Sequence, residues 1–138
     1  MDSSQNSRQT CMCVELDSDF YYLIQKYAER SGLSALLVSR GAEALPLAKK
    51  VRPSLICLEL DQGAATGAWE VLAHLKSDSE TAGIPVILFS WLDQEEQALK
   101  AGANVYVNKP VMYVDFIHAL EEAGIGTRPV DRLDNQKV

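Results

Sequence analysis

The stretch Pro53–Gly67, PSLICLELDQGAATG, decides the interpretation of this chain, because it places a carboxylate at the end of a buried strand. Residues 54–58 form an apolar run of the kind found in a parallel strand that is covered on both faces. A charged residue that closes such a run lies at the carboxyl end of the strand, where ligands gather in open α/β sheets. Glu59 is therefore the first candidate functional residue.

Three other strand-like runs end in polar groups in the same way, namely 11–15 (CMCVE), 86–90 (VILFS) and 105–110 (VYVNKP). The carboxyl ends of parallel strands meet at one edge of a sheet, so we expect the polar groups to surround one crevice. The residues that would meet there are Glu15, Asp17, Glu59, Ser90 and Lys109.

Strand and helix patterns alternate five times along the chain, which predicts a parallel sheet with helices on both faces. The first helix has the clearest pattern, with apolar residues at helical spacing from Phe20 to Ala28, a cap at Ser18 or Asp17, and an exit at Gly32. A strand over 33–38 follows. Further helices are expected over 42–51, around 69–75, over 94–101 and over 113–120.

The composition predicts one compact domain that works with protein partners. The chain has 138 residues, of which 47% are hydrophobic and 23% charged. A net charge of −6 without a basic cluster argues against a nucleic-acid or anionic-membrane surface. No apolar run reaches the roughly 18 residues of a membrane span, and the N-terminus lacks an apolar signal core, so we expect a cytoplasmic protein.

The cysteines, Cys11, Cys13 and Cys57, all fall inside predicted strands. Their number is odd and their spacing is not that of a metal site. We interpret them as small buried hydrophobic residues and expect no disulfide.

Four pieces of sequence carry a resemblance to a known family. They are VELDSDF at 14–20, the apolar strand whose closing carboxylate comes eight residues before Gly67, FS at 89–90, and AGANVYVNKP at 101–110. In this order and spacing they resemble the receiver domain of two-component response regulators. The resemblance covers 11–125, which leaves 1–10 and 126–138 as expected flexible tails, the second equally suited to a linker. It implies a flavodoxin-like (CheY-like) α/β fold of three layers, with a five-stranded parallel sheet in the order 2-1-3-4-5.

The resemblance also assigns roles to individual residues. In typical receivers a histidine kinase phosphorylates an Asp at the end of the third strand, acidic residues after the first strand help to hold Mg²⁺, and a Ser or Thr and a Lys contact the phosphoryl group. The matching positions here are Glu59 for the acceptor, Glu15 and Leu16 for the acidic pair, and Ser90 and Lys109 for the phosphoryl contacts. Tyr106 matches the aromatic position whose rotamer reports activation, although core packing explains it equally well.

Two of these positions depart from the family pattern. Glu59 is one methylene longer than Asp, so its oxygens lie about 1.5 Å out of place for in-line transfer. Leu16 puts a hydrocarbon where a metal ligand is expected, so Mg²⁺ binding should be weak or absent. Asp17 and Asp61 lie in the same acidic region, but we interpret them as a cap and a solvated loop charge. A Glu59–Lys109 ion pair would imitate part of a phosphoryl group and fix one conformation.

Two functions follow from this pattern. The favoured one is an atypical, non-enzymatic receiver in a phosphorelay, independent of phosphate and Mg²⁺, which binds a histidine kinase, an output protein or a second copy through residues 93–122. The alternative is a phospho-responsive receiver that uses Asp61 or Glu59 as a noncanonical acceptor. A small α/β enzyme is disfavoured, because no Gly-rich phosphate loop follows the first strand and no His or Cys accompanies a nucleophile-like Ser.

Overall fold

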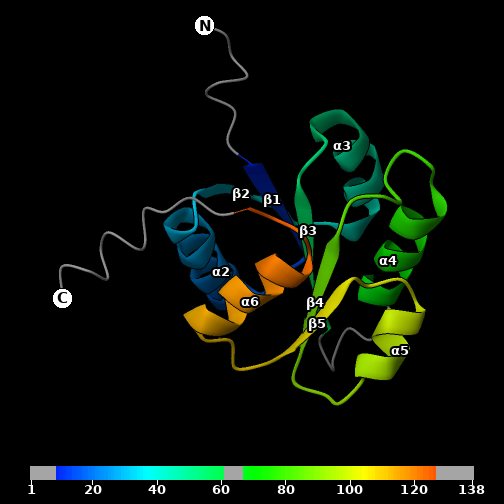
Figure 1. Ribbon diagram of the computed structural model, residues 1–138. Helices are drawn as coiled ribbons and strands as arrows, with labels where there is room; N and C mark the ends of the chain where they lie inside the picture. Colours follow the sequence, from blue (N-terminus) through cyan, green and yellow to red (C-terminus); the bar gives the residue numbers. More distant parts are fainter. Residues whose placement is uncertain (1–8, 61–66, 127–138) are drawn as a thin grey trace, which may run out of the picture.

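A computed structural model describes the fold of residues 9–60 and 67–126. Its middle layer is a parallel five-stranded sheet in the order β2-β1-β3-β4-β5, as predicted (Figure 1). The strands are β1 (Gln9–Val14), β2 (Leu33–Val38), β3 (Leu55–Leu60), β4 (Val86–Ser90) and β5 (Val105–Asn108). The buried run around Cys57 forms β3, the central strand of the sheet.

The helices follow the expected alternation. They are α2 (Ser18–Arg30), α3 (Ala44–Val51), α4 (Gly67–Ser77), α5 (Glu95–Lys100) and α6 (Tyr113–Glu122), with a 3-10 turn, η1 (Gly41–Glu43), before α3. Pro46 lies in the first turn of α3, where its missing N–H costs no helical hydrogen bond. Gly32, at φ 88°, provides the left-handed turn after α2. None of the helices in the described part of the chain is both long and apolar enough to span a membrane.

Two hydrophobic cores lie on opposite faces of the sheet. On one face, α2 and α6 pack against alternate strand residues such as Leu55, Cys57 and Phe89. On the other face, α3, α4 and α5 pack against the strand residues that alternate with these, such as Ile56 and Leu58 (Figure 1). This alternation places the side chain of Glu59 on the α2/α6 face.

β1 begins at Gln9, two residues before the predicted strand and inside the segment that the sequence predicts to be a tail. Gln9 pairs with Leu33, and Thr10 pairs with Ser34 of β2. Gln9 and Thr10 are polar, so no apolar pattern in the sequence predicts their place in a strand. Their pairing depends on the register of β1 with β2. The rest of the predicted tails, 1–8 and 127–138, lies outside the described residues.

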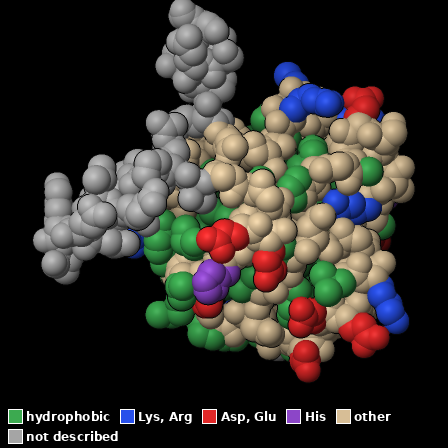
Figure 2. Space-filling view, viewed as in Figure 1, with side chains coloured by type: hydrophobic (Ala, Val, Ile, Leu, Met, Phe, Trp, Pro, Cys, Tyr) green, Lys and Arg blue, Asp and Glu red, His purple; other side chains and the backbone are tan. Residues whose placement is uncertain are grey.

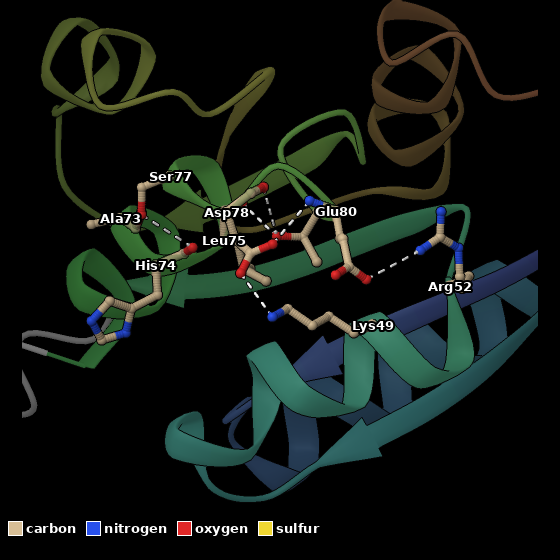
Figure 3. A network of polar contacts seen from close by, with 9 residues as sticks. Lys49, Arg52, Ala73, His74, Leu75, Ser77, Asp78 and Glu80 are labelled. Atoms are coloured by element: carbon tan, nitrogen blue, oxygen red, sulfur yellow. Dashed lines mark hydrogen bonds and ion pairs between the residues drawn. The ribbon is translucent and has the colours of Figure 1, made fainter.

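A network of polar contacts joins α3 to the loop after α4 (Figure 3). Lys49 Nζ lies 2.9 Å from Asp78 Oδ2, and the Glu80 N–H donates to Asp78 Oδ1 at 2.9 Å. The hydrogen bond with Lys49, and then that with the Glu80 N–H, holds the pKa of the Asp78 carboxyl below its usual range. The hydrogen bond with Asp78 raises the pKa of Lys49.

We predict that Asp78→Asn lowers the melting temperature at neutral pH. Because the pKa of Asp78 is lowered in the folded state, its ionised carboxylate stabilises the folded protein fully above the unfolded-state pKa of Asp, about 3.9. This contribution is lost as the pH falls through the lower folded-state pKa. The melting temperatures of the two proteins, measured by circular dichroism, should therefore converge as the pH falls through the folded-state pKa of Asp78. Glu80→Gln is the control, because the Glu80–Arg52 pair is exposed and 4.0 Å apart. An equal difference at every pH would contradict the role of the Asp78 charge.

Candidate functional site

An ion pair between Glu59 and Lys109 occupies the carboxyl edge of the sheet. Glu59 comes from the end of β3, and Lys109 follows β5 directly. Only 7% of each side chain is exposed, and Lys109 Nζ binds Glu59 Oε2. The other carboxylate oxygen, Oε1, accepts a hydrogen bond from the backbone N–H of Asp17 at 2.9 Å. The pair expected from the sequence is therefore present, and both oxygens of Glu59 are engaged.

Aromatic rings surround the ammonium group of Lys109. Its Nζ lies 4.2 Å from the ring centroid of Phe20 and 5.5 Å from that of Trp91. Rings at these distances attract a cation through their quadrupoles, so they hold Lys109 at the edge together with Glu59. A cavity of about 290 Å³ adjoins the rings, with Leu23 and Val111 in its apolar wall.

Glu15 does not join this site, contrary to the sequence-based expectation. Its backbone adopts φ 56°, and its Oε2 accepts a hydrogen bond from the Gly41 N–H at 2.6 Å. Its carboxylate also lies beside Gly67, the first residue of α4. The left-handed backbone turns the side chain toward η1 and α4, where the partial positive charge of a helix start favours a carboxylate.

Leu16 and Asp17 follow β1 and have different environments, and Asp17 has the capping role that the sequence predicts. Leu16 is 7% exposed and belongs to the core on the α2/α6 face. Asp17 caps α2, since its Oδ2 accepts from the N–H groups of Asp19 and Phe20 at 3.1 and 3.4 Å. Leu16 in the core offers no oxygen to a cation, and the carboxylate of Glu15 is turned toward Gly41. Asp61, the remaining acidic candidate, lies outside the described residues.

Ser90 and Tyr106 bind the segment between β4 and α5. Ser90 Oγ accepts from the Leu92 N–H at 2.9 Å, while the Tyr106 hydroxyl donates to the Leu92 carbonyl and accepts from the Gln94 N–H at 3.1 Å. Asn108 Nδ2 donates to the same Leu92 carbonyl at 3.2 Å. These bonds hold residues 91–94 against β5. Sequence analysis missed the role of Asn108, whose only signal is its place beside Lys109.

Two glycines make room for the carboxylate of Glu15, which gives a prediction. A Cβ atom at Gly67 would lie 2.8 Å from Glu15 Oε1, and one at Gly41 would lie 2.8 Å from Oε2. We expect Gly67→Ala to displace the carboxylate and to break its hydrogen bond with the Gly41 N–H, at a cost of about 1 kcal/mol. The Gly41 amide resonance in an NMR spectrum should shift as it does in Glu15→Ala. In the Glu15→Ala background, Gly67→Ala should leave that resonance unchanged, and a further shift would contradict the contact.

A parallel sheet in the order 2-1-3-4-5, with a carboxylate and a lysine at its carboxyl edge, is the architecture of a receiver domain. The chain belongs to the response-regulator receiver family. It is 32% identical over 116 residues to the polar-differentiation response regulator DivK of Brucella anthropi. The aligned residues make up 82% of this chain and 94% of that protein. DivK of Brucella ovis is 31% identical over the same shares of the two chains. No protein-family profile matches the chain.

Solved structures show the same fold. Chemotaxis protein CheY4 of Vibrio cholerae superposes with a TM-score of 0.75 at 15% identity, over 85% of this chain and 99% of that chain. A response regulator from Desulfuromonas acetoxidans gives a TM-score of 0.69 at 24% identity, over 82% and 94% of the two chains. The flavodoxin-like, CheY-like fold implied by the sequence is therefore confirmed.

Proposed function

We propose that this chain is an atypical receiver of two-component signal transduction, with a conformation that needs neither phosphorylation nor Mg²⁺, and that it acts in the cytoplasm as a protein-interaction module. The observation that carries the proposal is the buried ion pair between Glu59 and Lys109. It joins the residue at the phospho-acceptor position to the lysine that would otherwise contact a phosphoryl group.

Both carboxylate oxygens of Glu59, at the acceptor position, already have hydrogen-bond partners. Glu59 Oε2 is bound to Lys109, and Oε1 accepts the Asp17 N–H. Phosphorylation of either oxygen would break one of these contacts, in a reaction that depends on accurate positioning. The pair thus disfavours phosphorylation and keeps Lys109 drawn toward β3. We propose that Mg²⁺ binding is weak or absent for the same reason, because Leu16 and Glu15 offer it no oxygen beside Glu59.

The region from 93 to 122 has the properties of a protein-binding surface. Acidic side chains lie over α5 and α6 on the face shown in Figure 2, and those that are exposed include Asp93, Glu95, Glu96, Glu121 and Glu122. Two exposed apolar residues accompany them, namely Leu99 on α5 and Trp91 directly after β4. A groove of about 400 Å³ runs between β5 and α6. Apolar groups with an acidic surround suit a partner that carries a basic surface.

The binding of candidate histidine kinases and output proteins tests this proposal. We expect their affinity, measured by biolayer interferometry, to stay the same with acetyl phosphate and Mg²⁺ or with a chelator. Leu99→Glu should weaken binding about tenfold or more, the effect of roughly 1.4 kcal/mol. Val51→Glu is the matched control, because Val51 is similarly exposed but lies on α3. Binding that requires acetyl phosphate, with a phosphoryl group on Asp61 or Glu59 by mass spectrometry, would support the phospho-responsive alternative.

A further inference from the structure

The three cysteines of the chain converge in the core between the sheet and helices α2 and α6. Cys11 and Cys13 come from β1 and Cys57 from β3, and the register pairs Cys13 with Cys57. Cys11 Sγ lies 3.4 Å from Cys57 Sγ and 3.8 Å from Cys13 Sγ, and the three sulfurs are all within 4.8 Å of one another. All three residues are free thiols with no solvent exposure.

The surroundings of the thiols are apolar. The cluster belongs to the core between the sheet and helices α2 and α6, with Ile24 and Phe116 among its members. In the part of the chain that the structure describes, no histidine or carboxylate joins the three sulfurs. A ligand held there would thus have three sulfur donors.

From this geometry we propose that the cluster is a binding site for a soft, thiophilic ion held by three sulfurs, and that trivalent arsenic, taken up as arsenous acid, is the ion that suits it. Zinc–sulfur bonds of about 2.3 Å at tetrahedral angles put two sulfurs of one site about 3.8 Å apart. The separations of Cys11 Sγ from Cys57 Sγ and from Cys13 Sγ, 3.4 and 3.8 Å, are close to this spacing. Zinc in a structural site takes four ligands, and Mg²⁺ and Ca²⁺ take oxygens, so neither class matches three buried sulfurs.

Charge separates arsenic from other soft ions. Arsenous acid condenses with three thiols: three As–S bonds form, three As–O bonds break, and each hydroxyl leaves as water with a thiol proton. No electrons are exchanged, and the product is neutral. Cu(I) with three thiolates would leave two negative charges in a dry core, which is costly.

Native mass spectrometry of the reduced protein with sodium arsenite tests the site. We expect one arsenic per chain, with a mass gain of one arsenic less three hydrogens, and a higher melting temperature because the ion binds the folded state. Uptake requires local opening of a buried core, so incubation continues until the mass spectrum is constant. Cys57→Ala should lose this species, and Cys57→Val serves the same purpose if the alanine variant is poorly folded by circular dichroism.

Three results would overturn the proposal. Wild-type protein without bound arsenic would show that the cluster is only part of the core. If the Cys57 variant bound as much arsenic as the wild type, three sulfurs would not be required. A lower melting temperature with arsenite would show that the ion binds the unfolded chain instead. Cu(I) added in parallel should compete poorly, and Cu(I) binding in preference to arsenite would contradict the charge argument.

Discussion

Replacement of Lys109 by methionine is expected to destabilise the folded protein by about 3–5 kcal/mol, the cost of leaving a buried charge without its partner. The side chain of Glu59 is only 7% exposed, so solvent cannot replace the lost ammonium group. The Asp17 N–H would remain as its hydrogen-bond donor at one oxygen. Urea unfolding followed by circular dichroism measures the change in the free energy of unfolding.

A double-mutant cycle separates this charge effect from a loss of packing. Glu59→Gln keeps an acceptor for the Asp17 N–H but removes the negative charge, so the variant with both Glu59→Gln and Lys109→Met should recover much of the lost stability. Lys100→Met is the matched control, because its pair with Glu96 is exposed and should contribute little. If the double variant were as unstable as Lys109→Met alone, the ion pair would not be the source of the effect.

The second large effect concerns phosphorylation. We expect Glu59→Asp alone to accept phosphate from acetyl phosphate poorly, and Glu59→Asp combined with Leu16→Asp to do so roughly 10²-fold faster, the scale of a misplaced reacting group. The first substitution restores the usual acceptor, and the second adds an oxygen ligand where Leu16 now packs in the core. Intact-protein mass spectrometry, with Mg²⁺ and with a chelator, follows the phosphoryl group.

Leu16→Asp alone is the control, since it restores a ligand without the acceptor and should remain unphosphorylated. The carboxylate in a core position costs stability, so each variant is first compared with the wild type by NMR. Efficient Mg²⁺-dependent phosphorylation of Glu59→Asp alone would show that Leu16 does not limit the reaction.

Much of the architecture could be predicted from the sequence because it depends on local patterns. The apolar run before Glu59, the helical spacing after Phe20 and the glycines that end helices each indicate an element without knowledge of the rest. The Glu59–Lys109 pair was predictable in the same way, since both residues follow strands whose carboxyl ends share one edge.

Other features depend on the backbone conformation or on residues far away in the sequence. The positive φ of Glu15 turns its carboxylate toward Gly41, which no periodicity reveals in a non-glycine residue. The pairing of Gln9 with Leu33 extends β1 through polar residues. The contact between Cys11 and Cys57 needs the register of two strands that lie 46 residues apart. Each of these features results from tertiary structure, not from local propensity.

The most direct test of the central claim is an amide NMR titration of the wild-type protein, first with Mg²⁺ and then with beryllofluoride as a phosphoryl analogue. If the Glu59–Lys109 pair fixes one conformation, the resonances of Ser90, Trp91, Tyr106 and Lys109 should stay unchanged throughout. Saturable shifts at these residues would contradict the account, because they would show a working phospho-switch in the presence of Glu59 and Leu16.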